Sequence, residues 1–404
     1  MEEQTLEMTV NLEKEKKKNI RLAIGVASLG VVRFLTIYEM AEARGYCGRD
    51  GRGKGSLVPR GGFVAAAKQI IYVSFIVAII CVQLCIPLPD AAIANDTIVE
   101  ITPQGLQFKR EDKISIEKES LHISLKKIEV SYIFKNHSSK DITAEVAFPV
   151  PPYRIYDLLI GNHSHKPIQF GDFKAKVNNK QTSYKKEIRA LVNGKDYAPL
   201  LQSLNISIED FGKYDLANPD GANDVLRLTK EDKNKLLELG ILNEGEPVWT
   251  VEIKYHWTQT FPANSSVNIK HSYTPYYGGM YGVFQEWQNE VSGEVDSGIM
   301  QESCLAQDTK KAIEERAFAK VKGTHKAINL YYDWVSYILT TANNWKQPIK
   351  DFHLIIEKPE NAITSLCFGH KLIKTSPTRF EAHIKNFIPE KDLKVYFIFE
   401  EQVF

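Results

Sequence analysis

The sequence predicts a mainly β protein, made of two sandwich-like antiparallel units with a small helical insertion. Its most regular stretch, residues 128–152, contains two runs in which apolar and polar residues alternate. Because successive side chains on a strand point to opposite faces, each run offers one apolar face to a core. Similar runs recur from residue 95 to the C-terminus, and residues 200–245 change to a helical spacing. Strands therefore dominate the expected fold.

The stretch 128–152 is predicted to form a β-hairpin. Its two strands are Ile128 to Phe134 and Ile142 to Phe148, and its turn is the polar cluster Asn136 to Lys140. The exit, residues 148–152, reads FPVPP. Since proline has no amide donor, we expect this exit to leave the central ladder.

An uncharged apolar run, residues 70–86, lies between Lys68 and the small-residue site Ala92-Ile93-Ala94. This order is typical of a secretory signal peptide, which we predict over residues 64–94 with cleavage before Asn95. The protein is then periplasmic or secreted. The alternative is an uncleaved membrane anchor over residues 70–86, because the run approaches the ~20 residues that span a bilayer.

Residues 1–63 precede this leader and are rich in lysine, arginine and glycine. Signal peptides normally begin close to the start of a chain. We therefore interpret residues 1–63 as a gene-model extension ahead of a start near Val64. The alternative is a disordered tail on the cytoplasmic side of an anchor.

The composition is that of a globular protein, with 43% hydrophobic and 25% charged residues. The formal net charge of +1 argues against a nucleic-acid partner held by bulk charge. A membrane is expected to be a partner only through the leader, if the leader stays uncleaved.

The first unit, residues 95–277, is predicted to be a β-sandwich. Alternating runs fill residues 95–125, and another run, residues 173–177, ends in an Asn-Asn turn. Within the insertion at 200–245, Thr229 and Asp232 have the spacing of a helix N-cap and its third residue.

Residues 248–273 return to alternating runs, which we predict to be two paired strands. This pairing would let His256 and His271 meet across a hairpin. A histidine satisfied by hydrogen bonds is favoured there over a catalytic one.

The second unit, residues 278–404, is predicted to contain an aromatic loop, a helix and a C-terminal β unit. Glycines and aromatic residues alternate irregularly from 276 to 290, which indicates a flexible loop. Residues 308–322 place Ala312, Ile313, Ala317 and Val321 on one side of a helix.

Two cysteines, Cys304 and Cys367, remain once the leader is removed. An even pair in an oxidising compartment favours a disulfide. The alternative is a pair of buried free thiols.

An aromatic set gathers near the boundary between the two units. Aromatic side chains beside glycines can stack on sugars or anchor a protein partner. We therefore expect an unknown envelope protein or glycan as the partner. The alternative is that these rings cover the open end of a sandwich core. The predicted binding residues are Tyr273, Tyr276, Tyr277, Tyr281 and Trp287.

No catalytic residue, metal ligand or cofactor is assigned from the sequence. It contains no nucleophile elbow, phosphate loop or metalloprotease helix motif. His163 and His165 have the spacing of one strand face, but a third ligand is missing, so a solvated loop is favoured over a metal site.

Five short segments together resemble a bacterial exported family, the domain of unknown function 4424, from Asn95 to about Phe399. The resemblance implies export and no particular activity. The order of strands around AFPVP is also distantly similar to the β-sandwich that precedes von Willebrand A domains in inter-α-trypsin inhibitor chains. The five segments are Asn95-Asp96-Thr97, AFPVP at 147–151, YHWTQTFP at 255–262, HSYTP at 271–275 and YILTTANNW at 337–345.

The function expected from these observations is that of a non-catalytic binding or structural module of the cell envelope. The alternative is a cell-envelope hydrolase. An enzyme should gather polar titratable groups in a concave pocket, whereas a binding module should show a flat or grooved surface with aromatic residues.

Overall fold

A computed structural model describes residues 96–102, 105–154, 171–214, 218, 220–288, 290–324 and 326–403. These residues belong to a unit that spans 89–404. The predicted extension 1–63, the predicted signal peptide 64–94 and the histidines at 163 and 165 lie outside the described residues. Within the described ranges, no helix is long and apolar enough to cross a membrane.

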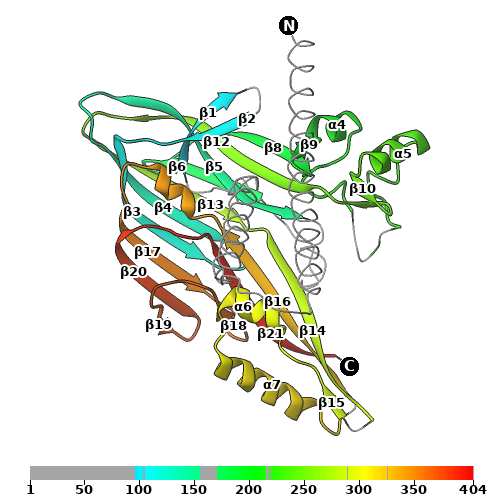
Figure 1. The fold of residues 1–404 in the computed structure, drawn as a ribbon. Helices are drawn as coiled ribbons and strands as arrows, with labels where there is room; N and C mark the ends of the chain where they lie inside the picture. The colour runs from blue at the N-terminus through cyan, green and yellow to red at the C-terminus, as the bar shows by residue number, and fades with distance from the viewer. Residues whose placement is uncertain are drawn as a thin grey trace, which may run out of the picture. The chain divides into compact units, whose positions relative to one another are not determined.

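The expectation of a mainly β fold is confirmed (Figure 1). The strands of the described residues form three larger sheets and one short ribbon. In spatial order, sheet 1 contains β2 (Gly105–Lys109), β1 (Thr97–Thr102), β5 (Ile142–Arg154), β12 (Thr250–Phe261), β8 (Lys185–Val192) and β9 (Lys195–Asp196). Sheet 2 contains β19 (Ile373–Ser376), β20 (Arg379–Phe387), β17 (Ile349–Glu357), β3 (Ile114–Ile123), β4 (Ile128–Asn136), β13 (Ser266–Thr274), β6 (Gly171–Val177) and β7 (Lys180–Gln181). Sheet 3 contains β15 (Glu290–Ser292), β14 (Tyr277–Trp287), β16 (Ala327–Tyr337), β21 (Leu393–Val403) and β18 (Ile363–Ser365), and the ribbon pairs β10 (Leu242–Asn243) with β11 (Glu246–Pro247).

Short helices connect these sheets. They are α4 (Ala198–Ser203), α5 (Lys230–Glu238), α6 (Ser297–Ser303), α7 (Gln307–Val321) and the 3-10 helix η1 (Thr340–Asn344). The predicted cap of α5 is confirmed, since the amide of Asp232 donates to Thr229 Oγ1 at 3.1 Å. The helix predicted over 308–322 is α7, which buries Ile313, Ala317 and Val321.

Sheets 1 and 2 pack face to face around the main core. The alternation read from the sequence is confirmed on β4, where Ile128, Val130, Tyr132 and Phe134 are all buried. Aromatic rings from the two sheets meet between them, as Phe134 of β4 lies 5.8 Å from Phe261 of β12, measured between ring centroids. A face-to-face arrangement of this kind is a β-sandwich.

The hairpin predicted over residues 128–152 is wrong. β4 pairs with β3 and β13 in sheet 2, whereas β5 pairs with β1 and β12 in sheet 1. The two strands stack across the core, because each presents its apolar face to the same interior. The strands β12 and β13 are likewise split between the two sheets, so the predicted pairing that would bring His256 to His271 is wrong as well.

The prolines of the segment 148–152 lie inside β5, although we expected them to leave the ladder. Within the part of the chain that the structure describes, β1 pairs with β5 from Glu145 to Ala147, and the following residues of β5 pair with β12. The register against β12 shifts between Val251 and Ile253, opposite these prolines. Proline is tolerated where a strand has an open edge or a bulge.

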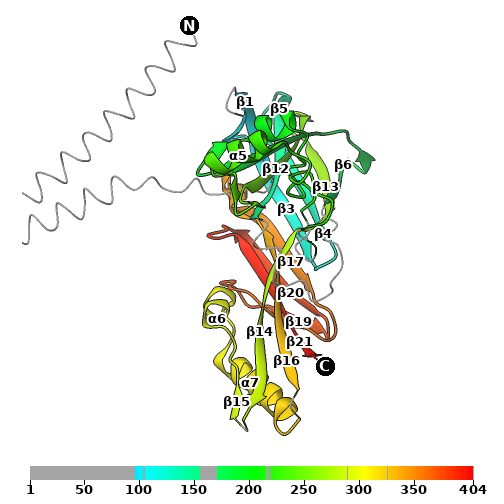
Figure 2. The same ribbon diagram turned by 90° about the vertical axis from the view of Figure 1, so that its right-hand side faces the viewer.

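Sheet 3 has a separate core beneath α7. Figures 1 and 2 show α6 and α7 beside β14 and β16, and the apolar residues of α7 pack there with Phe284, Ile328 and Tyr332. The other face of sheet 3 adds Tyr331, Val335 and Phe399 to the main core.

The aromatic loop predicted after residue 276 is a strand, β14. It pairs with β16 in a continuous antiparallel register from Tyr277 to Gln285. Gly278 is needed on this strand because a Cβ there would lie 2.5 Å from the indole of Trp334 on β16. The glycines therefore make room for aromatic neighbours, whereas the sequence had suggested flexibility.

β17 pairs with β3 in parallel and thereby carries strands of the C-terminal part into sheet 2. The predicted boundary between residues 277 and 278 stays a prediction, and sheet 2 contains strands from both sides of it.

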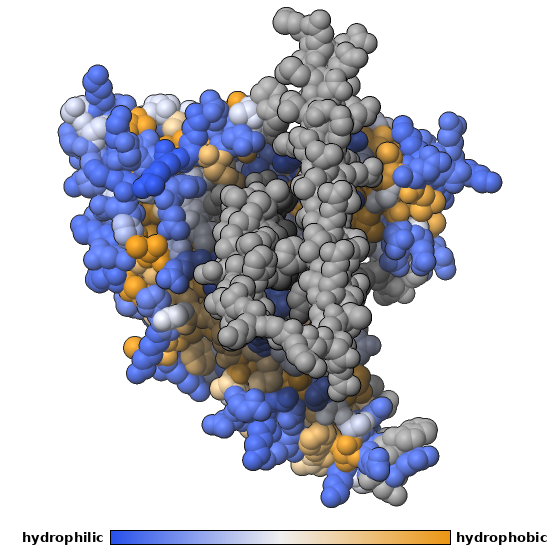
Figure 3. Space-filling view, viewed as in Figure 1, coloured by the Kyte–Doolittle hydropathy of each residue, from blue (hydrophilic) through white to orange (hydrophobic). Residues whose placement is uncertain are grey.

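The predicted disulfide between Cys304 and Cys367 is present, with 4.9 Å between their α-carbons. It joins the end of α6 to the segment that follows β18. Figure 3 shows mostly hydrophilic residues on the visible face, with small apolar groups between them, including near the α5 insertion.

Candidate functional site

The outer face of sheet 2 carries polar side chains in regular rows. On four neighbouring strands, alternate residues point into the core and the others point outward. The pairing register places Ser120 of β3 opposite Ser131 of β4, Ser131 opposite Lys270 of β13, and Lys270 opposite Lys176 of β6. A parallel row contains His122, Glu129, Ser272 and Lys174 in the same strand order.

These rows line a cavity of about 660 Å³, here called the lysine groove. The lysines come from β3, β6, β13 and the turn before β4, and hydroxyl and amide groups lie between them. The five lysines are Lys118, Lys127, Lys174, Lys176 and Lys270, and the lining polar neutral groups include Ser120, Ser131, Asn268 and Ser272.

Two of the five lysines have a carboxylate partner. Lys127 Nζ lies 2.7 Å from Glu129, and Lys174 Nζ lies 2.8 Å from Asp172. For Lys176 and Lys270, the described residues provide no ion pair within 4.0 Å. Like charges placed directly opposite each other on paired strands are destabilising. Lys176 and Lys270 therefore concentrate positive charge at a cost in stability.

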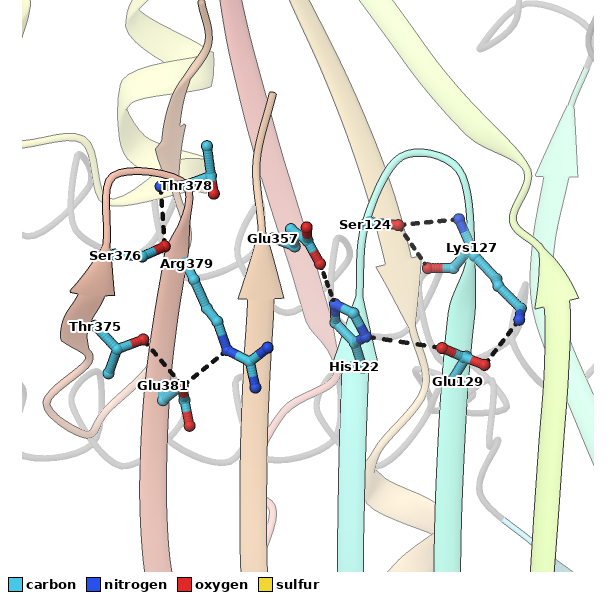
Figure 4. Close-up of polar contacts among 10 residues, drawn as sticks. All are labelled: His122, Ser124, Lys127, Glu129, Glu357, Thr375, Ser376, Thr378, Arg379 and Glu381. Carbon is cyan, nitrogen blue, oxygen red and sulfur yellow. Dashed lines mark hydrogen bonds and ion pairs between the residues drawn. The ribbon is translucent and has the colours of Figure 1, made fainter. Parts of the chain in front are cut away.

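One end of the lysine groove contains a histidine between two carboxylates (Figure 4). His122 Nε2 lies 2.9 Å from Glu357 of β17, and its Nδ1 lies 3.9 Å from Glu129 of β4. Figure 4 shows Lys127 on the far side of Glu129. Positive and negative groups are thus interleaved at this end, whereas the end near β6 is basic.

The chemistry that the lysine groove offers is recognition of oxyanions. A lysine ammonium has three donors and no acceptor, and serine and asparagine side chains add neutral donors. An open groove of this size admits an extended ligand rather than a small enclosed one.

Two of the predicted aromatic residues, Tyr273 and Tyr276, line a second cavity of about 260 Å³. This aromatic cavity lies where the end of β5 meets sheet 3, and Arg154 and Lys394 also line it. Tyr273 is buried and packs against Phe148, 5.6 Å between ring centroids. Tyr273 therefore belongs to the core as well as to the cavity wall.

The remaining predicted residues are not gathered at that cavity. Tyr277 lies on β14 and is partly buried against the main core. Tyr281 is 47% exposed, with its ring 6.0 Å from Tyr331. The side chain of Trp287 lies outside the described residues. The four aromatic side chains that the structure describes thus do not form one surface, and the role of the five residues in binding stays a prediction.

A cation also sits on an aromatic ring in this cavity. Lys394 Nζ lies 4.4 Å from the centre of the Trp334 ring and 2.6 Å from Glu302. The hydrogen bonds that Glu302 accepts from Lys394 and Tyr396 hold the pKa of its carboxyl below the usual value. Lys394 is therefore already neutralised by the protein.

Sequence reasoning missed the lysine groove. Lys174 and Lys176 alternate with the buried Phe173 and Ala175, so their outward direction could be read from the sequence. Their position beside Lys270 depends on the pairing of β6 with β13, and these strands are about 90 residues apart in the chain.

The fold and the disulfide define a two-sheet β-sandwich protein that carries a third sheet and a basic groove. The chain belongs to the family described as domain of unknown function DUF4424, which matches residues 94–396. A protein from Legionella pneumophila, described as a "putative nutrient binding protein", has a similar crystal structure with 17% sequence identity and a TM-score of 0.37; the similarity covers 76% of this chain and 70% of that one. A comparison with curated protein sequences gives no match.

Proposed function

We propose that this protein is an exported, non-catalytic binding module of the cell envelope, and that the lysine groove holds an acidic glycan. The observation that carries the proposal is the position of Lys176 directly opposite Lys270, with no carboxylate among the described residues to pair with either. An anionic ligand would offset the repulsion between the two ammonium groups.

The distribution of charge supports the same proposal. The whole chain has a formal net charge of +1, yet five lysines line one groove. The lining has five lysines and one carboxylate, Glu129, and such an excess of one sign of charge raises the local concentration of the opposite charge. Repeated carboxylates along a glycan would meet Lys176 and Lys270, which are spaced by one strand separation, about 4.8 Å.

Export is supported by the disulfide. Disulfides persist in oxidising compartments outside the cytoplasm, and Cys304 and Cys367 are bonded in the structure. The predicted leader at 64–94 and the distant resemblance to the sandwich of inter-α-trypsin inhibitor chains agree with an extracellular module, and both remain proposals.

The test compares a carboxylated oligosaccharide, oligogalacturonate, with its methyl-esterified neutral form, by isothermal titration calorimetry at low and moderate salt. The variant is Lys118→Gln/Lys176→Gln/Lys270→Gln. Its control is Lys235→Gln/Lys322→Gln/Lys346→Gln, which removes the same charge from exposed sites outside the groove.

We expect the acidic oligosaccharide to bind the wild type and the control, and the groove variant to lose about tenfold or more in affinity, which is a change of about 1.4 kcal/mol. Binding should weaken as salt rises, because released counterions and screening both oppose it. Equal losses in the two variants, or equal binding of the neutral ester, would reject the groove as the binding site.

A hydrolase is the second candidate, and the contact that favours it is the pair His122–Glu357 at the end of the groove. A histidine oriented by a carboxylate can act as a general base. Under this alternative, His122→Gln abolishes cleavage of an envelope glycan and leaves its binding intact. Unchanged ligand length after prolonged incubation with the wild type would count against it.

A further inference from the structure

Three side chains that bind metals in other proteins meet on the outer face of sheet 2. His353 of β17 lies directly opposite His383 of β20 in the antiparallel register, with 3.7 Å between the ring centroids. Glu381 lies two residues before His383, so it points to the same face of β20. One nitrogen of each histidine and one oxygen of the glutamate lie within 4.8 Å of one another.

The contact between His353 and Glu381 already has the form of a ligand pair. His353 Nε2 lies 2.8 Å from Glu381 Oε2, and both side chains are partly buried rather than fully exposed. Without a metal ion, this contact is a hydrogen bond between the two side chains. Imidazole nitrogen and carboxylate oxygen are also the atoms by which histidine and glutamate bind metals.

The carboxylate of Glu381 is held in place from its other side (Figure 4). Thr375 Oγ1 and Arg379 Nε donate to Glu381 Oε1, at 2.9 Å and 2.8 Å, which leaves Oε2 toward His353. The carboxylate is thus oriented by the protein, and outer partners of this kind orient metal ligands generally.

We propose that His353, His383 and Glu381 form a binding site for one divalent transition-metal ion of the zinc class. Two imidazole nitrogens and one carboxylate oxygen suit zinc. Ions that prefer oxygen ligands, such as calcium, would bind weakly to a site with two histidines. The three ligands come from one side of two strands, so the fourth position of a tetrahedral ion would face away from the sheet.

This metal site lies beside the lysine groove, but the proposal of a metal site does not depend on the groove. His353 lies opposite Ser120 in the parallel pairing of β17 with β3, and Ser120 lines the groove. An ion bound there would add positive charge at the neighbouring strand and offer an open coordination position to an oxyanion. The metal site would remain if the groove bound no anion.

The experiment measures Zn²⁺ binding to the full protein after removal of metal by a chelator, in competition with a chromogenic zinc indicator. Co²⁺ serves as a second probe, because its visible absorption reports nitrogen and oxygen ligands. The variants are His353→Ala, His383→Asn and Glu381→Gln. His370→Ala is the matched control, since His370 is an exposed histidine outside the cluster.

We expect each ligand variant to weaken one Zn²⁺ site by about a hundredfold and to remove the Co²⁺ absorption of that site. Thr375→Val should weaken it by about tenfold, because it removes a donor that orients Glu381. His370→Ala should bind as the wild type does. His383→Asn changes an exposed side chain, so it keeps the test valid if His353→Ala fails to fold.

Cysteines and histidines outside the cluster can also bind zinc, so the measured quantity is the difference between wild type and variant. The proposal is overturned if His353→Ala and His383→Asn retain the Zn²⁺ stoichiometry and the Co²⁺ spectrum of the wild type. It is also overturned if His370→Ala loses as much binding as they do.

Discussion

Asp96 and His271 are hydrogen-bonded to each other inside the sandwich. Both carboxylate oxygens of Asp96 lie 2.9 Å from His271 Nε2, and the two side chains are 1% and 0% exposed. The carbonyl of Asp96 also accepts a hydrogen bond from Trp345 Nε1 at 2.5 Å. Three segments that carry the resemblance to the family, around residues 96, 271 and 345, thus meet at one buried point.

Replacing Asp96 with Asn should lower the free energy of unfolding by about 1 to 3 kcal/mol, because the change removes a buried carboxylate whose two oxygens both contact His271 Nε2. Urea denaturation followed by tryptophan fluorescence measures it. Asp172→Asn, which changes an exposed aspartate, is the control. A loss below about 1 kcal/mol in Asp96→Asn would contradict this assignment of the pair.

Replacing Lys270 with Gln should raise the free energy of unfolding by about 0.2 to 1 kcal/mol when no ligand is present. The reason is that the substitution removes the repulsion between Lys270 and Lys176. Thermal denaturation of the ligand-free protein measures the gain. Lys174→Gln should give no gain, since Lys174 is paired with Asp172. A Lys270→Gln variant less stable than the wild type would show that Lys270 has a stabilising partner.

Replacing both Cys304 and Cys367 with serine should lower stability by about 4 kcal/mol, because the bond closes a loop of 63 residues and restricts the unfolded chain. Differential scanning calorimetry of the oxidised wild type and the double variant measures the change. A reducing agent should lower the stability of the wild type to that of the variant. Two free thiols in the protein purified from its native compartment would contradict the pairing.

Acid should remove a stabilising contribution of Glu381. The pKa of its carboxyl is about 2 in the folded protein, whereas the ordinary value for a glutamate, expected in the unfolded chain, is 4.5. The unfolded state therefore binds the proton more readily. The contribution is therefore complete above about pH 4.5 and is lost as pH falls toward 2. The stability difference between wild type and Glu381→Gln, measured by urea denaturation from pH 6 downward, should shrink across that window. A difference that stays constant would mean that the hydrogen bonds of Glu381 do not depend on its charge.

The faces of the strands could be predicted from the sequence, but their partners could not. Alternation on β4 correctly identified Tyr132 and Phe134 as buried. It could not show that β5 stacks across the core from β4, because a strand that pairs and a strand that stacks have the same period. For the same reason, the sequence could not show that Lys270 lies beside Lys176, because this contact depends on the pairing of β13 with β6.

Sequence motifs gave correct predictions where the interacting residues are close together in the sequence. The cap at Thr229 needs only the spacing to Asp232, and both residues lie in one helical turn. The glycines of β14 gave a wrong prediction of a flexible loop, because the need for glycine comes from a residue far away in the sequence. The ring of Trp334 occupies the space that a side chain at residue 278 would need. The cluster of His353, His383 and Glu381 was missed for the same reason, since its ligands come from two strands.

The parallel pairing of β17 with β3 sets the order in which the protein can assemble. Residues 119–123 can complete their pairing only after residues 352–356 have been synthesised, which happens much later. Until then β3 is an edge strand with an unpaired row of backbone groups, and such edges attract other chains. Long-range contacts of this kind slow folding and prolong exposure of partly formed sheets. The edge of β3 therefore stays open to other chains until the C-terminal strands pair with it.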